Sequence, residues 1–415
     1  LYGIDSLRHT LDFAGGRFAT EAIASNRVVG AYQRWLQMQT RPGSRGNPTD
    51  DVWPVRPNTV ITVAAHDSAD EAKRRADIVC DGRADQDDIM RALDRLPLEG
   101  GTIQLLEGTY IISQSIVISG SAQIIQGMGP STVIMVDDAP DYDPMDDWLT
   151  MVFVEPGAGF HCGLRNLVLD GNRANVEPIP VQGIEMYPAP VVKEFTLEDV
   201  TIRNCSANGV IVGTSLLPTF LPVLLLDNVT ITNCAGGLIL NECDARISNS
   251  RIVGSGGFLQ DGIYFSSGTS LTLVNTDVIG FTGNGIVCTN GGKSIAIHGG
   301  RIHGEFGNVL LWNVQDILID GPRLPPNFAG HSLEIFGDVD PALIPKRIHI
   351  TNTEITQSAA TGIRIELTED LIDEGEALRD IEISNCQIFE PVAQGIFVRG
   401  ANGVLIQGCN IQDTG

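Results

Sequence analysis

One strand-like segment recurs at irregular intervals through most of this chain, and it constrains the fold more than any other feature. Copies such as Asp227-Asn228-Val229-Thr230-Ile231 and Thr351-Asn352-Thr353-Glu354-Ile355 align on their last residue. That slot holds Leu169, Ile202, Ile231, Ile252, Val278, Ile302, Leu324, Ile355, Ile388 and Ile411. The 242 residues from Leu169 to Ile411 contain nine steps, an average of about 27 residues each. Irregular spacing with β-branched alternation predicts stacked coils of strands with variable loops, and it disfavours propeller blades and helical repeats.

A second repeat places a glycine before an apolar-x-apolar strand, as in Gly209-Val210-Ile211-Val212. Alternate residues of a strand point to opposite faces, so the residues beside the middle one point inward and the middle one points outward. The outward positions are Glu185, Ile211, Ile239, Tyr264, Val287, Arg364 and Phe397. This outward column is mainly apolar, which is typical of a covered surface.

Asparagines also recur at one position of the repeat, at Asn166, Asn228, Asn249, Asn275, Asn352 and Asn385. Asparagine tolerates left-handed backbone conformations, and stacked amides can bond one another. We therefore predict a structural ladder of asparagines at one corner of the coils.

The segment before the repeats contains Asp81-Gly82, acidic residues at Asp85, Asp87 and Asp88, and a Gly-Gly-Thr-Ile…Glu-Gly-Thr-Tyr run over residues 100–110. It closely resembles the entry segment of the pectate-lyase-like superfamily of right-handed parallel β-helices. Val63–Ser68 adds a likeness to tail-fibre and tail-spike members. The resemblance covers residues 59–415 and implies an all-β solenoid, with an entry and cap segment at 59–110 and the β-helix at 111–415.

Residues 1–58 lie outside this resemblance. Val28, Tyr32, Trp35 and Leu36 share one helical face, which predicts a helical segment over residues 1–40. Residues 41–58 are rich in proline and glycine and read as a linker.

Charge and hydropathy exclude two classes of partner. The formal charge of −24 repels a phosphate backbone, so nucleic acid is a poor partner. No uninterrupted apolar run is long enough to predict a membrane-spanning helix. Eight cysteines without a Cys-x-x-Cys pair indicate neither a zinc site nor a disulfide framework, and we expect buried thiols.

The resemblance directs the search for chemistry to an outward strand face. Asp261, just before Gly262, corresponds to an aspartate of polygalacturonase-like hydrolases, but Gly283-Asn284 and Phe306-Gly307-Asn308 stand where their further catalytic residues would be. A lone carboxylate cannot act as both acid and base, so this mechanism is disfavoured.

A polysaccharide lyase needs a base that removes the proton α to a uronate carboxylate. The candidates are Tyr264, His298, Arg301 and His303, with Glu185 and Arg364 as substrate-binding residues on the outward column. The alternative for His298 and His303 is a surface position beside the Gly299-Gly300 turn.

An acidic run between residues 137 and 147 contains Asp137, Asp138, Asp141 and Asp143. Such a density of oxygen ligands could hold Ca²⁺, and the alternative is a solvated acidic loop.

Three functions remain open from the sequence, the third being a host adhesin or surface-layer protein. The first is a tail-spike-like or tail-fibre-like structural protein that engages a surface polysaccharide, extracellular or on a virion. In it the apolar column and the N-terminal segment would be covered in a homotrimer. The second is a secreted polysaccharide lyase or glycoside hydrolase with an atypical active site.

Overall fold

A computed structural model describes residues 59–143, 148–155, 161–187, 194–213, 221–255, 260–289, 292–338 and 343–412. The predicted helical segment and linker over residues 1–58 lie outside these residues. None of the helices in the described ranges is long and apolar enough to cross a membrane.

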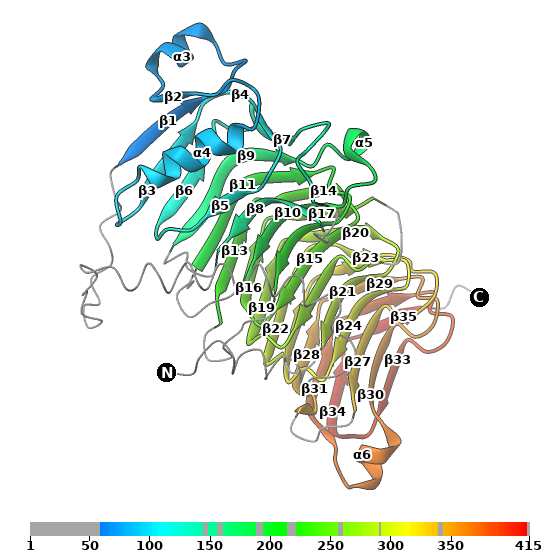
Figure 1. The fold of residues 1–415 in the computed structure, drawn as a ribbon. Helices are drawn as coiled ribbons and strands as arrows, with labels where there is room; N and C mark the ends of the chain where they lie inside the picture. The colour runs from blue at the N-terminus through cyan, green and yellow to red at the C-terminus, as the bar shows by residue number, and fades with distance from the viewer. Residues whose placement is uncertain are drawn as a thin grey trace, which may run out of the picture.

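The described chain winds as a parallel β-helix whose coils each contribute strands to three faces, as the sequence predicts (Figure 1). One face is an eleven-stranded sheet of β5 (Ile116–Ile118), β8 (Leu149–Val154), β10 (Val181–Met186), β12 (Asn208–Val212), β15 (Gly236–Asn241), β18 (Ile263–Ser266), β21 (Asn284–Thr289), β24 (Gly307–Trp312), β27 (Leu333–Gly337), β30 (Ile363–Leu367) and β33 (Ile396–Arg399).

A twenty-stranded sheet bends around the other two faces. Its first face contains β1 (Val60–Ala64), β2 (Ile78–Val79), β3 (Gly101–Leu105), β6 (Gln123–Gln126), β13 (Val223–Asp227), β16 (Asp244–Ser248), β19 (Ser270–Val274), β22 (Ser294–His298), β25 (Asp316–Asp320), β28 (Lys346–Thr351), β31 (Leu378–Ser384) and β34 (Ala401–Gln407). Its second face contains β4 (Gly108–Ile112), β7 (Thr132–Val136), β14 (Thr230–Cys234), β17 (Arg251–Gly254), β20 (Asp277–Phe281) and β23 (Ile302–Gly304). Two long strands, β9 (Cys162–Asp170) and β11 (Glu194–Arg203), run through both faces.

A four-stranded sheet continues the second face toward the C-terminal end. It contains β26 (Arg323–Leu324), β29 (Glu354–Thr356), β32 (Gln387–Phe389) and β35 (Asn410–Gln412). A parallel bridge between Arg301 and Arg323 links it to the preceding coil.

The predicted inward column is confirmed by the strand register. Leu169, Ile202, Ile231, Ile252, Val278 and Ile302 pair in turn, and Leu324, Ile355, Ile388 and Ile411 follow in the next sheet. The column is buried except at Ile411, in the last described coil, which is 48% exposed. Each coil thus buries its aliphatic side chains against the coils above and below it.

The corner between the first and second faces has a left-handed backbone in every repeat. The predicted asparagines all have a φ between 48° and 53°, and Asp199, Gly299, Gly321 and Gly408 occupy the same position, three residues before the inward column. The predicted pairing of amides with their copies is only partly right, because Asn249 and Asn352 donate to Asp227 and Asp320 of the preceding coil, at 3.0 and 2.7 Å.

The entry segment covers the N-terminal end of the core. Helix α4 (Asp85–Asp94) lies beside β4 and β5 and buries Ile89, Ala92 and Leu93. The short helix α3 (Asp70–Arg75) lies beyond it, α5 (Arg173–Val176) follows β9, and α6 (Glu369–Asp373) lies at the opposite end of the molecule (Figure 1).

The outward column is confirmed in register, and its apolar members are partly covered within the chain. Ile211, Ile239 and Phe397 are half-buried, and Val287 is only 5% exposed. Val287 lies between Tyr264 and Leu310 in the column, and these larger neighbours flank its short side chain. Val287 is therefore covered within the single chain.

Candidate functional site

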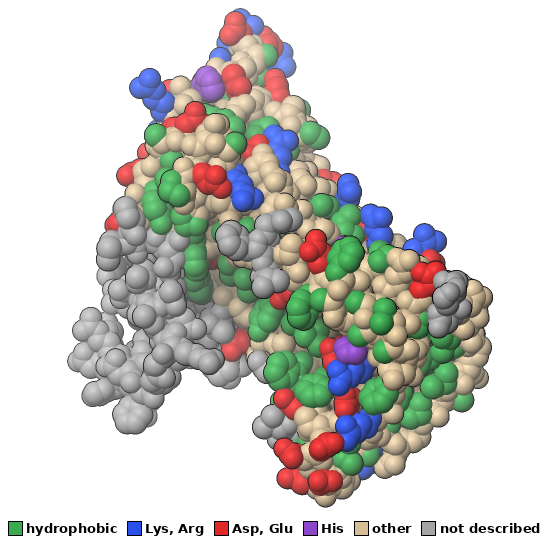
Figure 2. Space-filling view, turned by 90° about the vertical axis from the view of Figure 1, so that its right-hand side faces the viewer, with side chains coloured by type: hydrophobic (Ala, Val, Ile, Leu, Met, Phe, Trp, Pro, Cys, Tyr) green, Lys and Arg blue, Asp and Glu red, His purple; other side chains and the backbone are tan. Residues whose placement is uncertain are grey.

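The C-terminal part of the eleven-stranded sheet carries two outward columns of mixed chemistry. Strand pairing aligns Leu310, Glu334, Arg364 and Phe397 in one column, and Trp312, Phe336, Glu366 and Arg399 in the next. Because outward residues of a strand are two apart, the columns lie side by side on β24, β27, β30 and β33. Figure 2 shows hydrophobic, acidic and basic side chains gathered together on one face of the molecule.

Arg364 is the centre of a network of charged groups. Its Nη1 donates to Glu334 Oε1 at 3.0 Å, and its Nε donates to Glu366 Oε2 at 2.8 Å. Arg399 donates to the other oxygen of Glu366 at 3.2 Å and to Glu369 at 2.6 Å. Charge-assisted bonds of this kind hold side chains in fixed directions on an otherwise flexible surface.

His331 lies against this network in a defined tautomer. The backbone N–H of Thr361 donates to its Nδ1 at 3.1 Å, so the proton of the neutral ring is on Nε2. Nε2 lies 3.0 Å from Arg364 Nη1, which also carries hydrogens. Burial lowers the pKa of His331, Arg364 lowers it further, and Glu334 opposes them. His331, Arg364 and the two glutamates therefore form one polar cluster, where the polar groups of a ligand would meet both charges and an imidazole.

Aromatic surface borders the charged groups. Trp312 is 38% exposed and packs edge-on against Phe336, with ring centroids 6.3 Å apart. Flat apolar rings beside fixed donors and acceptors suit a ligand that is apolar on its faces and polar at its edges, as sugar rings are.

Of the predicted substrate-binding residues, Arg364 lies at the centre of this site and Glu185 does not. Glu185 is seven strands away from Arg364 in the same column, is 3% exposed, and accepts hydrogen bonds from Thr150 at 2.6 Å and Trp148 at 3.1 Å. Its burial and satisfied carboxylate argue against the predicted contact with a substrate and indicate a structural role.

Asp261 lies at the corner before β18 and accepts hydrogen bonds from the next coil. Its Oδ1 accepts hydrogen bonds from the backbone N–H and the side-chain amide of Asn284, at 2.7 and 3.1 Å. A local structural contact thus accounts for this carboxylate.

The four predicted base candidates are divided between two sheets. Tyr264 lies on β18 in the eleven-stranded sheet, with its hydroxyl 3.2 Å from that of Thr289. His298 ends β22 and lies 4.0 Å from Asp320, while Arg301 and His303 lie at β23. The structure therefore does not bring Tyr264 together with the other three.

The predicted calcium ligands do not converge. Asp137 bonds the backbone N–H of Ala139, Asp138 accepts from the Asn172 amide, and Asp141 accepts from Gln114. Together with Asp143 they form no group of three close ligands within the described ranges. Their arrangement is that of the alternative, an acidic loop held by separate hydrogen bonds.

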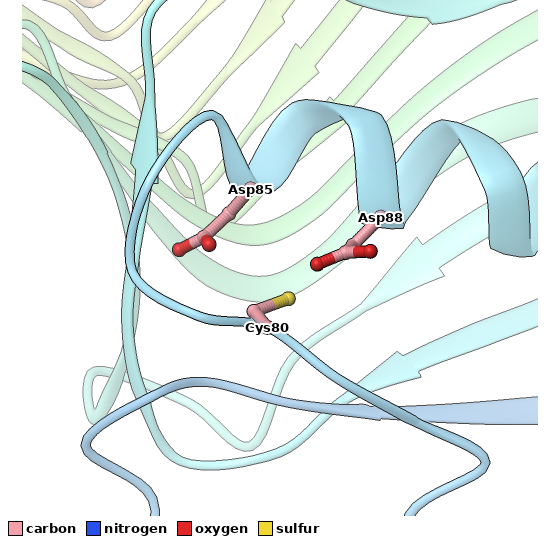
Figure 3. A group of neighbouring side chains, drawn as sticks. All are labelled: Cys80, Asp85 and Asp88. Carbon is pink, nitrogen blue, oxygen red and sulfur yellow. The ribbon is translucent and has the colours of Figure 1, made fainter.

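The described residues do contain one compact group of potential metal ligands, Cys80, Asp85 and Asp88, with ligand atoms within 4.8 Å of one another (Figure 3). Asp85 accepts backbone hydrogen bonds from Gly82 at 2.9 Å and Ile111 at 2.8 Å, so both of its oxygens are in use. Burial raises the pKa of the Cys80 thiol, which keeps it protonated at neutral pH. These contacts tie helix α4 to β4 and give the group a structural role.

The cysteines are free thiols, as expected, and all but Cys409 are buried. Burial raises the pKa of Cys162 to about 11 and that of Cys386 to about 11. These values mark the two thiols as packing groups rather than nucleophiles.

Sequence reasoning missed Trp312, His331, Glu334, Glu366 and Arg399. The glycine-strand pattern skips β27, because Ser332 takes the place of the corner glycine. His331 precedes β27 in a loop, and the length of this loop differs from coil to coil, so the repeat does not predict its position. Extending the outward column through β24 and β27 would have exposed Glu334 beside Arg364.

Comparisons with known proteins agree with this architecture. Residues 167–321 match a family model described as the right handed beta helix region. The chain therefore has the right-handed parallel β-helix fold. A search of curated protein sequences found no match.

Solved structures resemble this β-helix over most of its length. The surface adhesin PfbA of Streptococcus pneumoniae is 14% identical, and the match covers 80% of this chain and 89% of that one, with a TM-score of 0.54. The A-module of the mannuronan C-5 epimerase AlgE6 of Azotobacter vinelandii is 18% identical over 80% and 96%, with a TM-score of 0.50. The catalytic domain of a GH87 α-1,3-glucanase is 15% identical, and the match covers 89% of this chain and 67% of that one, with a TM-score of 0.50. Identities this low establish the shared fold alone.

Proposed function

We propose that this β-helix binds a surface polysaccharide at the C-terminal part of its eleven-stranded sheet, in the manner of a tail-spike or tail-fibre protein. The observation that carries the proposal is the cluster of Arg364, two glutamates and His331, whose Nε2 lies 3.0 Å from Arg364 Nη1, beside the exposed ring of Trp312. The adhesin and the two enzymes above support the polysaccharide class, because one is a surface protein and the other two are named for a glycan.

An extracellular or virion-associated location follows from such a ligand, since surface polysaccharides lie outside the cell. The tail-spike role itself rests on the likeness of the entry segment to such proteins. No nucleic acid is expected as a partner at a net charge of −24.

The proposal is tested by binding of the purified chain to a panel of bacterial surface polysaccharides, with mannuronan and α-1,3-glucan included, by isothermal titration calorimetry. Trp312→Ala should weaken binding about tenfold or more, because it removes a stacking surface. Leu318→Ala is the matched control, because Leu318 is also 38% exposed but lies on β25 in the other sheet.

Arg364→Gln should weaken binding by a similar factor, since it removes the charged group that holds Glu334 and Glu366 in place. Arg347→Gln is its control, because Arg347 pairs with Asp316 on the other sheet. Equal loss in a variant and its control, or no binding to any member of the panel, would overturn the proposal.

A catalytic alternative is favoured by one observation, the placement of Glu334, Glu366 and a histidine of lowered pKa at one site. These groups could exchange protons with a bound sugar as a lyase or hydrolase does. Release of reducing ends, or ultraviolet absorbance of an unsaturated product, from the bound polysaccharide would assign the chain to that class.

A further inference from the structure

The asparagine corner is interrupted in two successive coils, where Gly299 and Gly321 stand between Asn275 and Asn352. Both glycines keep the left-handed backbone, with φ of 66° and 75°, but they have no side chain to fill the corner. A Cβ added at Gly321 would meet only the backbone nitrogen of Gly299, at 4.0 Å. The missing side chains therefore leave open space at the surface.

A hollow of about 430 Å³ lies at this point and is lined by Asp277, Gly300, Arg301, Gly321 and Arg323. Its side chains carry two positive charges and one negative charge. The lining therefore has a positive balance in a chain whose net charge is −24. The hollow lies away from the eleven-stranded sheet and is separate from the proposed polysaccharide site.

The two arginines are stacked and weakly compensated. Arg301 and Arg323 form a bridge between successive coils, so their backbones are about one strand spacing, roughly 4.8 Å, apart. The nearest carboxylate atoms lie 3.8 Å from Arg301, on Asp277, and 3.5 Å from Arg323, on Glu354. Their side chains are 48% and 73% exposed.

Arg364 and Arg399 differ from this pair, since each donates hydrogen bonds to glutamates. No guanidinium hydrogen bond is formed by Arg301 or Arg323 within the described part of the chain, so both retain N–H donors for a ligand. Two adjacent guanidinium groups that are ion-paired but donate no hydrogen bond to a carboxylate are stabilised by an anion with several oxygens, to which each can donate in its planar fork geometry.

We propose that this hollow binds an oxyanion, a sulfate or carboxylate group of an acidic glycan. Arg301 and Arg323 donate to its oxygens, and the glycines admit it to the corner. Arg301 is then a ligand-binding residue rather than a catalytic base.

The test is isothermal titration calorimetry at low ionic strength, with sodium sulfate, sodium D-glucuronate and D-glucose as separate probes. We expect saturable binding of sulfate, glucuronate or both, and none of glucose. Sulfate alone would indicate a sulfated glycan, and glucuronate would indicate a uronic acid. Arg301→Gln with Arg323→Gln should weaken binding more than tenfold, because charge-assisted hydrogen bonds are lost.

Two further variants separate the hollow from general charge effects. Gly321→Asn restores the side chain of the ladder in a conformation that asparagine tolerates, so it should block binding while the thermal midpoint is retained. Arg251→Gln is the matched control, because Arg251 lies in the same outward column beside Asp277 but outside the lining of the hollow.

Absence of saturable binding in the wild type, equal binding of glucose and glucuronate, or wild-type affinity in the double variant would overturn the proposal. Trp312→Ala should leave the affinity for these probes unchanged, so this result is independent of the proposed polysaccharide site.

Discussion

At the scale of single residues, asparagine and glycine both allow the left-handed backbone of the corner, but only asparagine has a side chain that covers the surface there. Asn275 and Gly299 occupy the same left-handed corner of successive coils, because both residue types tolerate a positive φ. The asparagine side chain fills the corner, whereas glycine leaves it open. A substitution that is neutral for the fold thereby decides where a ligand can enter.

Asp261→Asn should leave any hydrolytic activity nearly intact. Its Oδ1 serves Asn284 as an acceptor, and an asparagine keeps that acceptor. Turnover of a polysaccharide that the wild type degrades is the measurement, with circular dichroism as the check on folding. A thousandfold loss with the fold unchanged would show that Asp261 is a catalytic residue.

His331 should make stability depend on pH. Its pKa in the folded protein lies below the usual value, so the unfolded chain binds a proton more readily. The free energy of unfolding attributable to this group is then highest above about pH 6.5 and falls as the pH is lowered through that value.

Thermal midpoints measured from pH 8 to pH 5 should decline less in His331→Gln than in the wild type, because glutamine keeps an acceptor for Thr361 but does not titrate. Glu334, Arg364 and Glu366 surround position 331 in both proteins, so their own contributions to the pH dependence are the same in the comparison. Identical declines of the thermal midpoint in the two proteins would contradict a lowered pKa of His331.

At the scale of elements, the coil is the unit of stability, since each strand pairs with the strands of the coils above and below it. Inward residues of one slot, such as Ile231, Ile252 and Val278, pair in turn. A residue inside the stack is therefore covered by neighbouring coils on both sides. A residue of the last described coil is covered by a described coil on one side.

Ile252→Ala should lower the free energy of unfolding by about 2–5 kcal/mol, because it opens a cavity in a fully buried column. Ile411→Ala is the matched comparison in the same column, and it should cost clearly less because Ile411 is 48% exposed. Urea unfolding followed by circular dichroism measures both. Equal costs would mean that Ile411 is covered in solution.

At the scale of the whole molecule, Ile211 and Ile239 are half-buried and form an apolar surface on a strongly acidic protein, in the part of the eleven-stranded sheet that precedes the proposed polysaccharide site. Burying such side chains more fully contributes roughly 1.5–3 kcal/mol each, which favours association through this face. We expect a homotrimer, as in fibre-like appendages whose closed symmetry prevents open-ended growth.

Light scattering should then give about three times the chain mass of 44.5 kDa. A mass near 44.5 kDa that does not change with concentration would exclude the trimer and favour a monomeric secreted enzyme.

The sequence by itself determined the coil, because the features that define it are local. Inward alternation at Ile252 and a left-handed corner at Asn249 follow from the strand period and from backbone sterics, which act within a few residues. The site depended on tertiary structure. His331 and Arg364 are separated by 33 residues, and loops of unequal length set the register that brings their nitrogens to 3.0 Å. The same stacking placed Arg301 over Arg323 beside the open corner at Gly321. Repeat periodicity fixes which residues point outward, whereas the length of each intervening loop decides which outward residues become neighbours.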